Sequence, residues 1–536
     1  MVVAEQVTVA DVDAKASEAA ARWCVLGMIA LTLAVNVPMF ICNTVFGDDW
    51  AWVWVHHWQG AGAIQHYLTM IAHPGFGPLI NLPFLIGGDV PGRAARTMAV
   101  IFHLANGWML WRIFREGRGH AIFGASVAIL YLASPFLNGN RATLSHAEYD
   151  VFIFAYLASV QISGRRGVGA MIAAILCQAV ALSIETLAPL EIVRWWYLWQ
   201  RGEQPKAIAW RGAPYVSIVL ALLIARLTVF VPGGYATGHN AVEPLAIGAV
   251  LHGIVTHLHY YLLAMEPLKF VPKLFGHENA AIIVVLFLAS AGVGFVAYRI
   301  PPAALPPRRR LALFVVGGVV LFAGMAPYVA AGRPPTWTGF YARLAVMSQF
   351  GVFILGAAVL AVLPGRAARG VAIALLVFLF SAMELQFGKW MLYDELVVGD
   401  FQSQLADEFA HHDPELLFVH FQPRSDKILF VGRCLANYDI NVALNITGRD
   451  RGSFAYDADC QAAEYTADGK CGATAFAQTP CPPKWDADFR LRPGMQPFTR
   501  FRIADLARHV IDGAPLDAGD LIVDRSSGSV RVGKNP

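Results

Sequence analysis

Eleven mostly apolar stretches of the chain constrain its fold more than any other feature. The first covers residues 23–45 and is long enough to cross a bilayer, which takes about 20 apolar residues in a helix. The other ten run approximately over residues 96–114, 120–137, 150–163, 168–184, 187–199, 212–231, 279–298, 311–331, 343–363 and 369–388. This pattern predicts a polytopic α-helical membrane protein with about 11 transmembrane helices.

The composition excludes a single water-soluble domain and a disordered chain. Apolar residues make up 56% of the sequence and charged residues only 15%, against about 25% charged residues in soluble domains. The charges gather in residues 389–536, which hold 16 basic and 21 acidic residues. We therefore expect a cytoplasmic segment at 1–22, a transmembrane domain at 23–388, and a small soluble α/β domain at 389–536.

Basic residues between the apolar runs predict the orientation in the membrane. Five short loops carry Arg or Lys, and such loops usually face the cytoplasm. With eleven crossings, residues 46–95, 138–149 and 232–278 then lie outside, as does the whole tail. The five loops contain Arg112, Arg115, Arg118, Arg165, Arg166, Arg201, Lys206, Arg211, Arg308, Arg309, Arg310, Arg366 and Arg369.

Four cysteines in the tail, Cys434, Cys460, Cys471 and Cys481, agree with this orientation. An even set in a small domain outside the cytoplasm predicts two disulfides, with three possible pairings. Four free thiols or a zinc site are the alternatives.

The outer loop at 46–95 has the composition of helices that lie in the membrane interface. It is rich in tryptophan and histidine near its start, and an apolar stretch broken by Pro and Gly follows over 75–88. Aromatic rings of this kind sit at the depth of the lipid headgroups. We expect interfacial juxtamembrane helices here, with His56 and His73 as loop residues near an acceptor.

Two adjacent carboxylates, Asp48 and Asp49, follow the first apolar run directly. Acidic residues so close to the hydrocarbon are costly and are usually functional or paired. Further short motifs come after them in the order His73-Pro74-Gly75-Phe76-Gly77-Pro78-Leu79, Arg93-Ala94-Ala95-Arg96, Arg112-Ile113-Phe114-Arg115 and Ser145-His146-Ala147-Glu148-Tyr149-Asp150. This order resembles the amino-terminal half of the GT-C class of polytopic glycosyltransferases, which includes lipid A aminoarabinose transferases and protein O-mannosyltransferases.

The resemblance implies roles for particular residues. Asp48 would take the proton of the acceptor hydroxyl, and Asp49 would orient the acceptor or bind a metal. Glu148 and Asp150 both match the position of a second acidic residue at the start of the fourth crossing. The cofactor stays unknown, with a divalent cation such as Mg²⁺ or Mn²⁺ as one alternative.

Arginines at the outer boundary would bind the phosphate of the donor lipid. Arg343 resembles the family's Arg-Tyr element at the head of a late crossing, and Arg333 lies in the same loop; guanidinium groups suit phosphate. Snorkelling to lipid headgroups is the alternative for both. Arg226 lies inside an apolar run and would pair with a carboxylate such as Asp150 or reach the phosphate. His257 is a further loop residue, whose spacing from its neighbouring histidines does not favour a metal site.

The sequence therefore predicts a GT-C-type glycosyltransferase in a bacterial inner membrane, with its site and tail periplasmic. It would move a sugar from a polyprenyl-phosphate donor to an envelope glycan or glycolipid, and direct attack would invert the anomeric centre. Membrane lipids are expected partners and nucleic acid is not. The alternatives are a transporter or flippase for lipid-linked glycans and a non-catalytic, membrane-anchored assembly protein.

Overall fold

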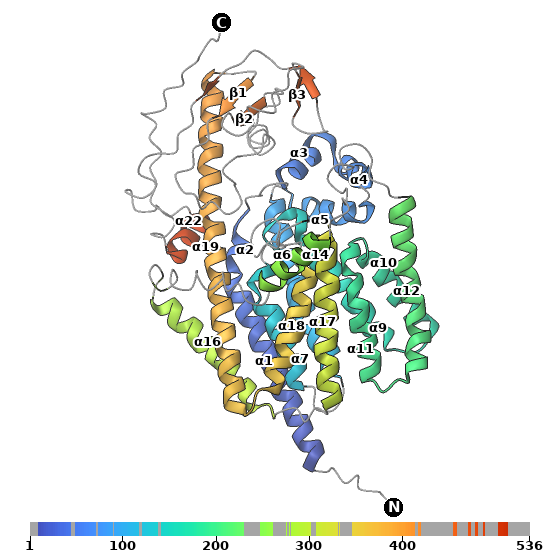
Figure 1. Ribbon diagram of the computed structural model, residues 1–536. Coiled ribbons are helices and arrows are strands. Elements are labelled where there is room, and N and C mark those ends of the chain that lie inside the picture. Colours follow the sequence, from blue (N-terminus) through green and yellow to red (C-terminus); the bar gives the residue numbers. More distant parts are fainter. Residues whose placement is uncertain are drawn as a thin grey trace, which may run out of the picture.

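Helices form the main body of the computed structural model, as Figure 1 shows. The structure describes residues 9–43, 49–70, 73–88, 90–116, 121–137, 141–229, 247–260, 275, 278, 280–301, 307–330, 332, 346–412, 416–419, 454–457, 470–472, 478–480, 486–487 and 502–512.

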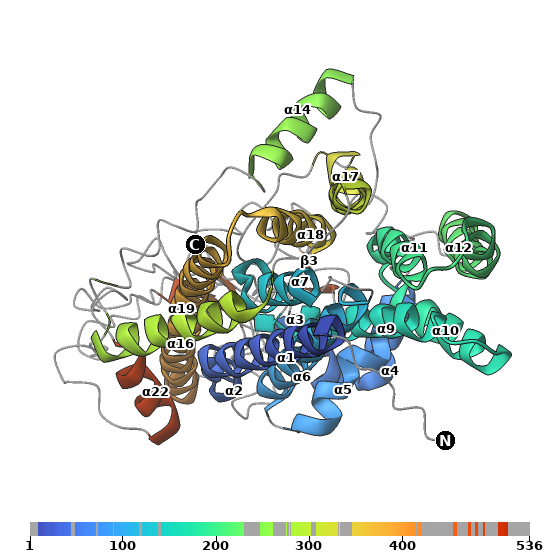
Figure 2. The same ribbon diagram turned by 90° about the horizontal axis from the view of Figure 1, so that it is seen from below.

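Each of the eleven predicted apolar runs overlaps at least one α-helix. These helices are α1 (Val9–Val35), α2 (Val37–Ile41), α6 (Pro91–Phe114), α7 (Ala121–Ala133), α9 (Ala147–Ser163), α10 (Val168–Ala181), α11 (Glu191–Gln200), α12 (Pro205–Thr228), α16 (Ala280–Arg299), α17 (Pro307–Ala330), α18 (Val346–Val362) and α19 (Arg366–His412). The short 3₁₀ helix η4 (Glu185–Leu190) precedes α11, and α14 (Ile247–Leu258) lies at the edge of the molecule in Figure 2.

In the part of the chain that the structure describes, five helical segments are long and apolar enough to cross a membrane: Lys15–Val35, Pro205–Ala225, Ala280–Arg299, Pro307–Ala330 and Arg366–Tyr393. Their outer surfaces are apolar, since Val285 and Leu288 of α16 are 65% and 62% exposed. Large exposed apolar surfaces of this kind mark contact with lipid. The chain is therefore an α-helical, multi-pass membrane protein, as the sequence predicts.

One end of the bundle gathers segments that are predicted to share the cytoplasmic side. Arg115 forms an ion pair with Glu18, and Arg201 lies 3.6 Å from Glu116. Arg369 donates to the carbonyl of Ile300 over 2.6 Å. We call this region, with Arg115, Arg165, Arg201 and Arg369, the arginine end.

The opposite end, which we call the α3 end, carries three helices of the first predicted outer loop (Figure 1). These are α3 (Asp49–Gln59), α4 (Ala61–Met70) and α5 (Gly77–Gly87), with the 3₁₀ helix η1 (Pro74–Phe76) between α4 and α5. Helices thus occupy the part of the sequence where interfacial helices are expected. Two further 3₁₀ helices, η2 (Pro135–Leu137) and η3 (Leu144–His146), connect α7 to α9.

Helix α19 links the bundle to the tail. Its 47 residues correspond to about 70 Å at 1.5 Å per residue, more than twice a hydrocarbon core of about 30 Å. The helix ends at His412, two residues before Pro414, which cannot continue it. It therefore crosses the predicted domain boundary at 388/389 without a break.

The described part of the tail contains short strands and one helix. Strand β1 (Leu416–Val419) pairs in parallel with β2 (Phe454–Asp457) and β5 (Asp486–Ala487), and β3 (Lys470–Gly472) pairs antiparallel with β4 (Gln478–Pro480). Helix α22 (Ile503–Asp512) packs against α19 and α2. The α/β fold of the whole tail stays a prediction.

Glycines bring α17 and α18 into close contact. A Cβ atom on Gly351 would lie 2.4 Å from the backbone nitrogen of Leu321, and one on Gly324 would lie 2.6 Å from the backbone of Met347. Small residues commonly allow such close approach between membrane helices.

Candidate functional site at the α3 end

Asp49 is one of the two carboxylates predicted to act in catalysis, and the structure describes its surroundings. It is the first residue of α3 and its side chain is fully buried. Its Oδ2 accepts a hydrogen bond from the backbone N–H of Leu144 over 2.7 Å. Asp49 is thus anchored to the segment that precedes α9.

Arg96 of α6 supplies the positive charge beside this carboxylate. Its buried guanidinium donates to the carbonyls of Cys42 (2.6 Å) and Ala142 (2.9 Å), and it interacts electrostatically with Asp49 and Glu395. Arg96 therefore joins the end of α2, the segment before η3 and the start of α3.

Arg93, one turn before Arg96, reinforces the same connection. Pro91 lies in the first turn of α6, where its missing N–H costs no hydrogen bond. From that turn the Arg93 side chain reaches the carbonyl of Ile41 over 2.8 Å. The spacing of three residues places both arginines on one face of α6.

The segment between η2 and α9 is held by a second buried ion pair. Arg141 pairs with Glu384 of α19, and their side chains are 0% and 1% exposed. Two residues along, the Thr143 hydroxyl lies 2.6 Å from Nδ1 of His146. These contacts fix the backbone that presents the Leu144 amide to Asp49.

The two candidates for a second acidic residue, Glu148 and Asp150, occupy the first turn of α9 and are both buried. An Oδ1 atom of Asp150 accepts hydrogen bonds from the Tyr131 hydroxyl (3.0 Å) and from the Asn106 amide (3.3 Å). His103 places Nδ1 3.6 Å from the same oxygen.

Asp150 therefore belongs to a polar cluster between α6, α7 and α9. The His103 ring stacks on Tyr131 with their centroids 4.6 Å apart, which encloses the carboxylate among ring and amide groups. A carboxylate inside a membrane bundle needs such partners, because it is costly to bury otherwise.

The predicted histidines are dispersed. The ring of His56 stacks on Phe84 of α5 at 4.1 Å, and the ring of His73 meets Phe76 edge-on at 5.1 Å. Both belong to the α3 end. His257 lies on α14, where its Nδ1 is 2.8 Å from the Gly253 carbonyl, and α14 is far from α3 in Figure 2.

Several predicted residues lie outside the described part of the chain: Asp48, Arg333, Arg343, Cys434, Cys460 and Cys481. The backbone of Arg226 belongs to α12 and that of Cys471 to β3, and their side chains are not described. The assignments made for these residues therefore remain predictions.

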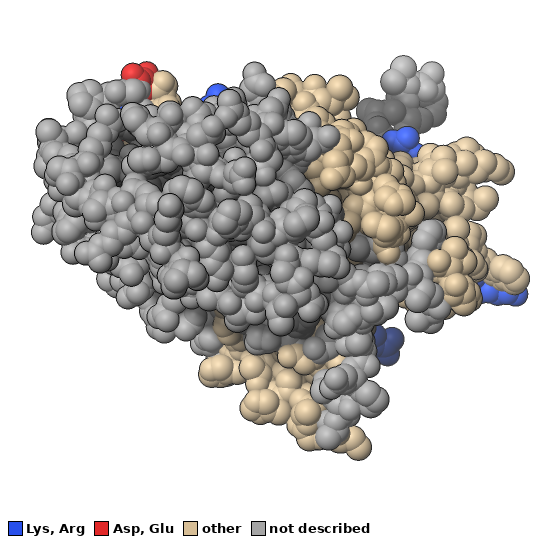
Figure 3. All heavy atoms as spheres, turned by 90° about the horizontal axis from the view of Figure 1, so that it is seen from above, with Lys and Arg blue, Asp and Glu red and all other residues tan. Residues whose placement is uncertain are grey.

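Within the described residues, no three His, Cys, Asp or Glu side chains are arranged to hold a metal ion. The same part of the chain shows a largely uncharged surface where it is visible from above in Figure 3, with a few separate groups of basic atoms. The side chains of Asp49, Arg96, Arg141, Asp150 and Glu384 are instead buried.

Sequence reasoning missed Arg96, Arg141, Glu384 and Glu395 as members of this cluster. For Glu384 a signal was present, since it is an acidic residue inside the apolar run at 369–388. Such a residue in a membrane helix usually has a partner in the bundle. The sequence did not identify that partner.

Comparison of the chain with models of protein families, with curated proteins and with solved structures gives no match.

Proposed function

We propose that the chain is a membrane glycosyltransferase that moves a sugar from a polyprenyl-phosphate donor to an acceptor hydroxyl at the α3 end. The observation that carries the proposal is the position of Asp49. It is buried beside Arg96 and bonded to the Leu144 amide, so this carboxylate of the first loop is held within one end of the bundle.

The proposal gives Asp48 and Asp49 different tasks. An oxygen of Asp49 is already occupied by a backbone amide and its side chain is buried, which suits a positioning residue. Asp48 is its direct neighbour and would act as the general base. The acceptor oxygen would bond to C1 of the sugar as its proton moves to the Asp48 carboxylate, while the bond from C1 to the phosphate oxygen breaks.

The departing group would be polyprenyl phosphate, which carries the electron pair of the broken bond. Arg343 and Arg333 would stabilise its charge through charge-assisted hydrogen bonds. One attack from the face opposite the leaving group would invert the anomeric centre. A divalent cation at Asp49 is not required by this scheme.

The finer topology is part of the same proposal. Eleven crossings would place the α3 end and an α/β tail in the periplasm, and the arginine end in the cytoplasm of a bacterial cell. The contacts among predicted cytoplasmic segments support this, since Glu18, Arg115, Glu116 and Arg201 form two linked pairs at one end. Nucleotide sugars are not supplied outside the cytoplasm, which favours a lipid-linked donor.

A transporter for lipid-linked glycans is the second candidate. The observation that favours it is the buried Glu191–Arg194 pair of α11, because charged groups inside a membrane bundle can mark a transport path. Such a protein would move the donor across a bilayer without breaking the bond between sugar and phosphate.

The test compares sugar transfer by purified protein and by three single variants. Asp48→Asn should lower transfer about 10²–10⁴-fold while donor lipid still binds. Asp49→Asn should lower both transfer and thermal stability, because it weakens a buried anchor, and Asp512→Asn on the exposed face of α22 should change neither. Transfer at the normal rate by Asp48→Asn would contradict the assignment of the base.

A further inference from the structure

A large cavity lies at the arginine end, on the far side of the bundle from the candidate site. Its volume is about 1050 Å³, it is open to the surface, and it is lined by the turn between α9 and α10, the turn between α11 and α12, and the first turns of α12. These four helices stand together at one side of the molecule in Figure 2. Among the residues with a proposed role in sugar transfer, Asp49 is described, and it does not line this cavity.

The charge of the cavity is strongly positive. Arg165, Arg166, Arg201 and Arg211 line it, and among the described lining residues Glu203 is the acidic one. Glu203 pairs with Arg211. Arg166 and Arg201 lie near enough to Arg211 to repel it electrostatically. Arg201 lies 3.6 Å from Glu116, so two carboxylates offset two of the four guanidinium groups, and Arg165 and Arg166 carry the remaining positive charge.

Two of these arginines are available to a ligand. In the described residues, the side chains of Arg165 and Arg166 form neither a hydrogen bond nor an ion pair, and both are exposed. Arg211 is held in place by donating to the carbonyl of Arg165 over 2.9 Å. Guanidinium groups at such a site can bind a phosphate through paired hydrogen bonds.

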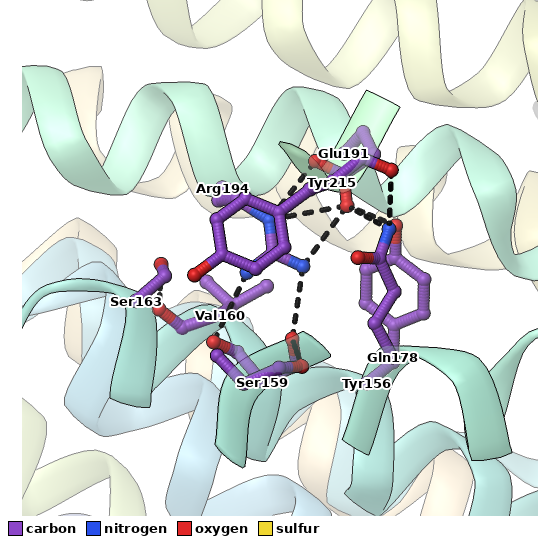
Figure 4. Close-up of polar contacts among 9 residues, drawn as sticks. Tyr156, Ser159, Val160, Ser163, Gln178, Glu191, Arg194 and Tyr215 are labelled. Atoms are coloured by element: carbon purple, nitrogen blue, oxygen red, sulfur yellow. Dashed lines mark hydrogen bonds and ion pairs between the residues drawn. The ribbon is translucent and has the colours of Figure 1, made fainter. Parts of the chain in front are cut away.

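A buried, hydrogen-bonded polar cluster lies behind the wall of the cavity and is shown in Figure 4. Tyr215 lines the cavity and is itself 3% exposed, with its ring 3.8 Å from the Arg194 guanidinium. Arg194 donates to Glu191 (2.9 Å) and to the Ser159 hydroxyl (3.0 Å). Because Glu191 balances Arg194, this cluster supports the wall without offsetting the charge of Arg165 and Arg166.

The rim of the cavity is apolar. Val168, Met171 and Trp210 line it and are 68%, 39% and 73% exposed. Val168 and Met171 begin α10, and Trp210 lies on α12, whose segment Pro205–Ala225 is long and apolar enough to cross the membrane. A ligand in this position would meet arginines at one side and apolar side chains at the other.

We propose that this cavity binds the phosphate headgroup of an anionic phospholipid, whose acyl chains lie along Val168, Met171 and Trp210. Basic residues at the membrane surface attract anionic lipids, at about 1 kcal/mol for each Lys or Arg. The apolar rim favours a lipid over a soluble phosphate compound. The site stands apart from sugar transfer and does not depend on it.

The experiment measures lipid retention by native mass spectrometry of the full-length protein in detergent. Phosphatidylglycerol is the probe and phosphatidylcholine the neutral comparison. The double variant Arg165→Gln/Arg166→Gln removes two free guanidinium groups from the cavity. The double variant Arg308→Gln/Arg366→Gln removes two exposed arginines outside the cavity's lining and has the same change in charge.

Retention of phosphatidylglycerol should fall about tenfold or more in the cavity variant and stay unchanged in the control variant. Glycerol phosphate in excess should not displace the lipid from the unmodified protein. Equal retention of phosphatidylglycerol by the two variants would contradict the proposed lipid site. Displacement of the lipid by glycerol phosphate would also contradict it and would indicate a site for soluble phosphates. The single variant Arg166→Gln gives the same test, with a smaller loss, if the double variant cannot be purified.

Discussion

Glu384→Gln is expected to destabilise the protein far more than the loss of an exposed ion pair. The Glu384 side chain is 1% exposed and pairs with Arg141, which is 0% exposed. Removing one charge leaves the other buried without its counter-ion, which costs about 3–5 kcal/mol in proteins. The same change should also lower activity, because Arg141 holds the segment that bonds to Asp49.

A matched pair at the arginine end provides the control. Arg115 and Glu18 also form a close ion pair, but their side chains are 29% and 56% exposed. Solvent screens such a pair, so Glu18→Gln should cost about 0–1 kcal/mol. Replacing both members of the buried pair, as Arg141→Met with Glu384→Leu, should recover much of the loss, since no unpaired charge is left.

Unfolding of each purified variant by sodium dodecyl sulfate in mixed micelles, followed by tryptophan fluorescence, gives the free energies of unfolding. We expect the free energy of unfolding of Glu384→Gln to be lower than that of Glu18→Gln by at least about 2 kcal/mol. Equal free energies of unfolding for these two variants would refute the claim that the buried Arg141–Glu384 pair stabilises the protein more than an exposed pair does.

Three further predictions follow from the packing and the topology. Gly351→Val should lower the free energy of unfolding by about 1–3 kcal/mol, because the added side chain overlaps the Leu321 backbone. A Cβ atom on Gly292 of α16 would meet no atom within 4 Å, so Gly292→Val should lower this free energy less in the same detergent titration. The four tail cysteines should resist alkylation until they are reduced, as mass spectrometry of non-reduced protein can test; immediate labelling of all four would contradict two disulfides. A reporter active only outside the cytoplasm should work when fused after Pro536 and stay silent when inserted at Arg308, and the reverse pattern would invert the proposed orientation.

Helix positions could be predicted from the sequence because a long run of apolar residues favours a helix at its own place in the chain. Each predicted run overlaps a helix, and the tryptophan-rich loop contains α3, α4 and α5. The end of α19 was not predicted from hydropathy, because the apolar run stops at residue 388 while the helix continues to His412. Polar residues continue a helix where neither Pro nor a cap ends it.

The site was only partly predictable. The basic loops predicted that residues 46–95 and 138–149 lie on the same side of the membrane, and the Leu144 amide bonds to Asp49. The pairing of Arg141 with Glu384 joins residues 243 positions apart. Such a contact depends on how the helices pack, and no local pattern specifies it. Tail residues outside the described ranges leave the predicted disulfides untested.

The most direct test of the proposed function is sugar transfer by the purified protein. The protein would be incubated with a panel of labelled polyprenyl-phosphate sugars and an extract of envelope glycans and lipids. We predict release of free polyprenyl phosphate together with a labelled glycan or glycolipid. This release should be lowered about 10²–10⁴-fold in Asp48→Asn and retained in Asp512→Asn. Movement of an intact donor across liposomes without any transfer would contradict the account and support a transporter.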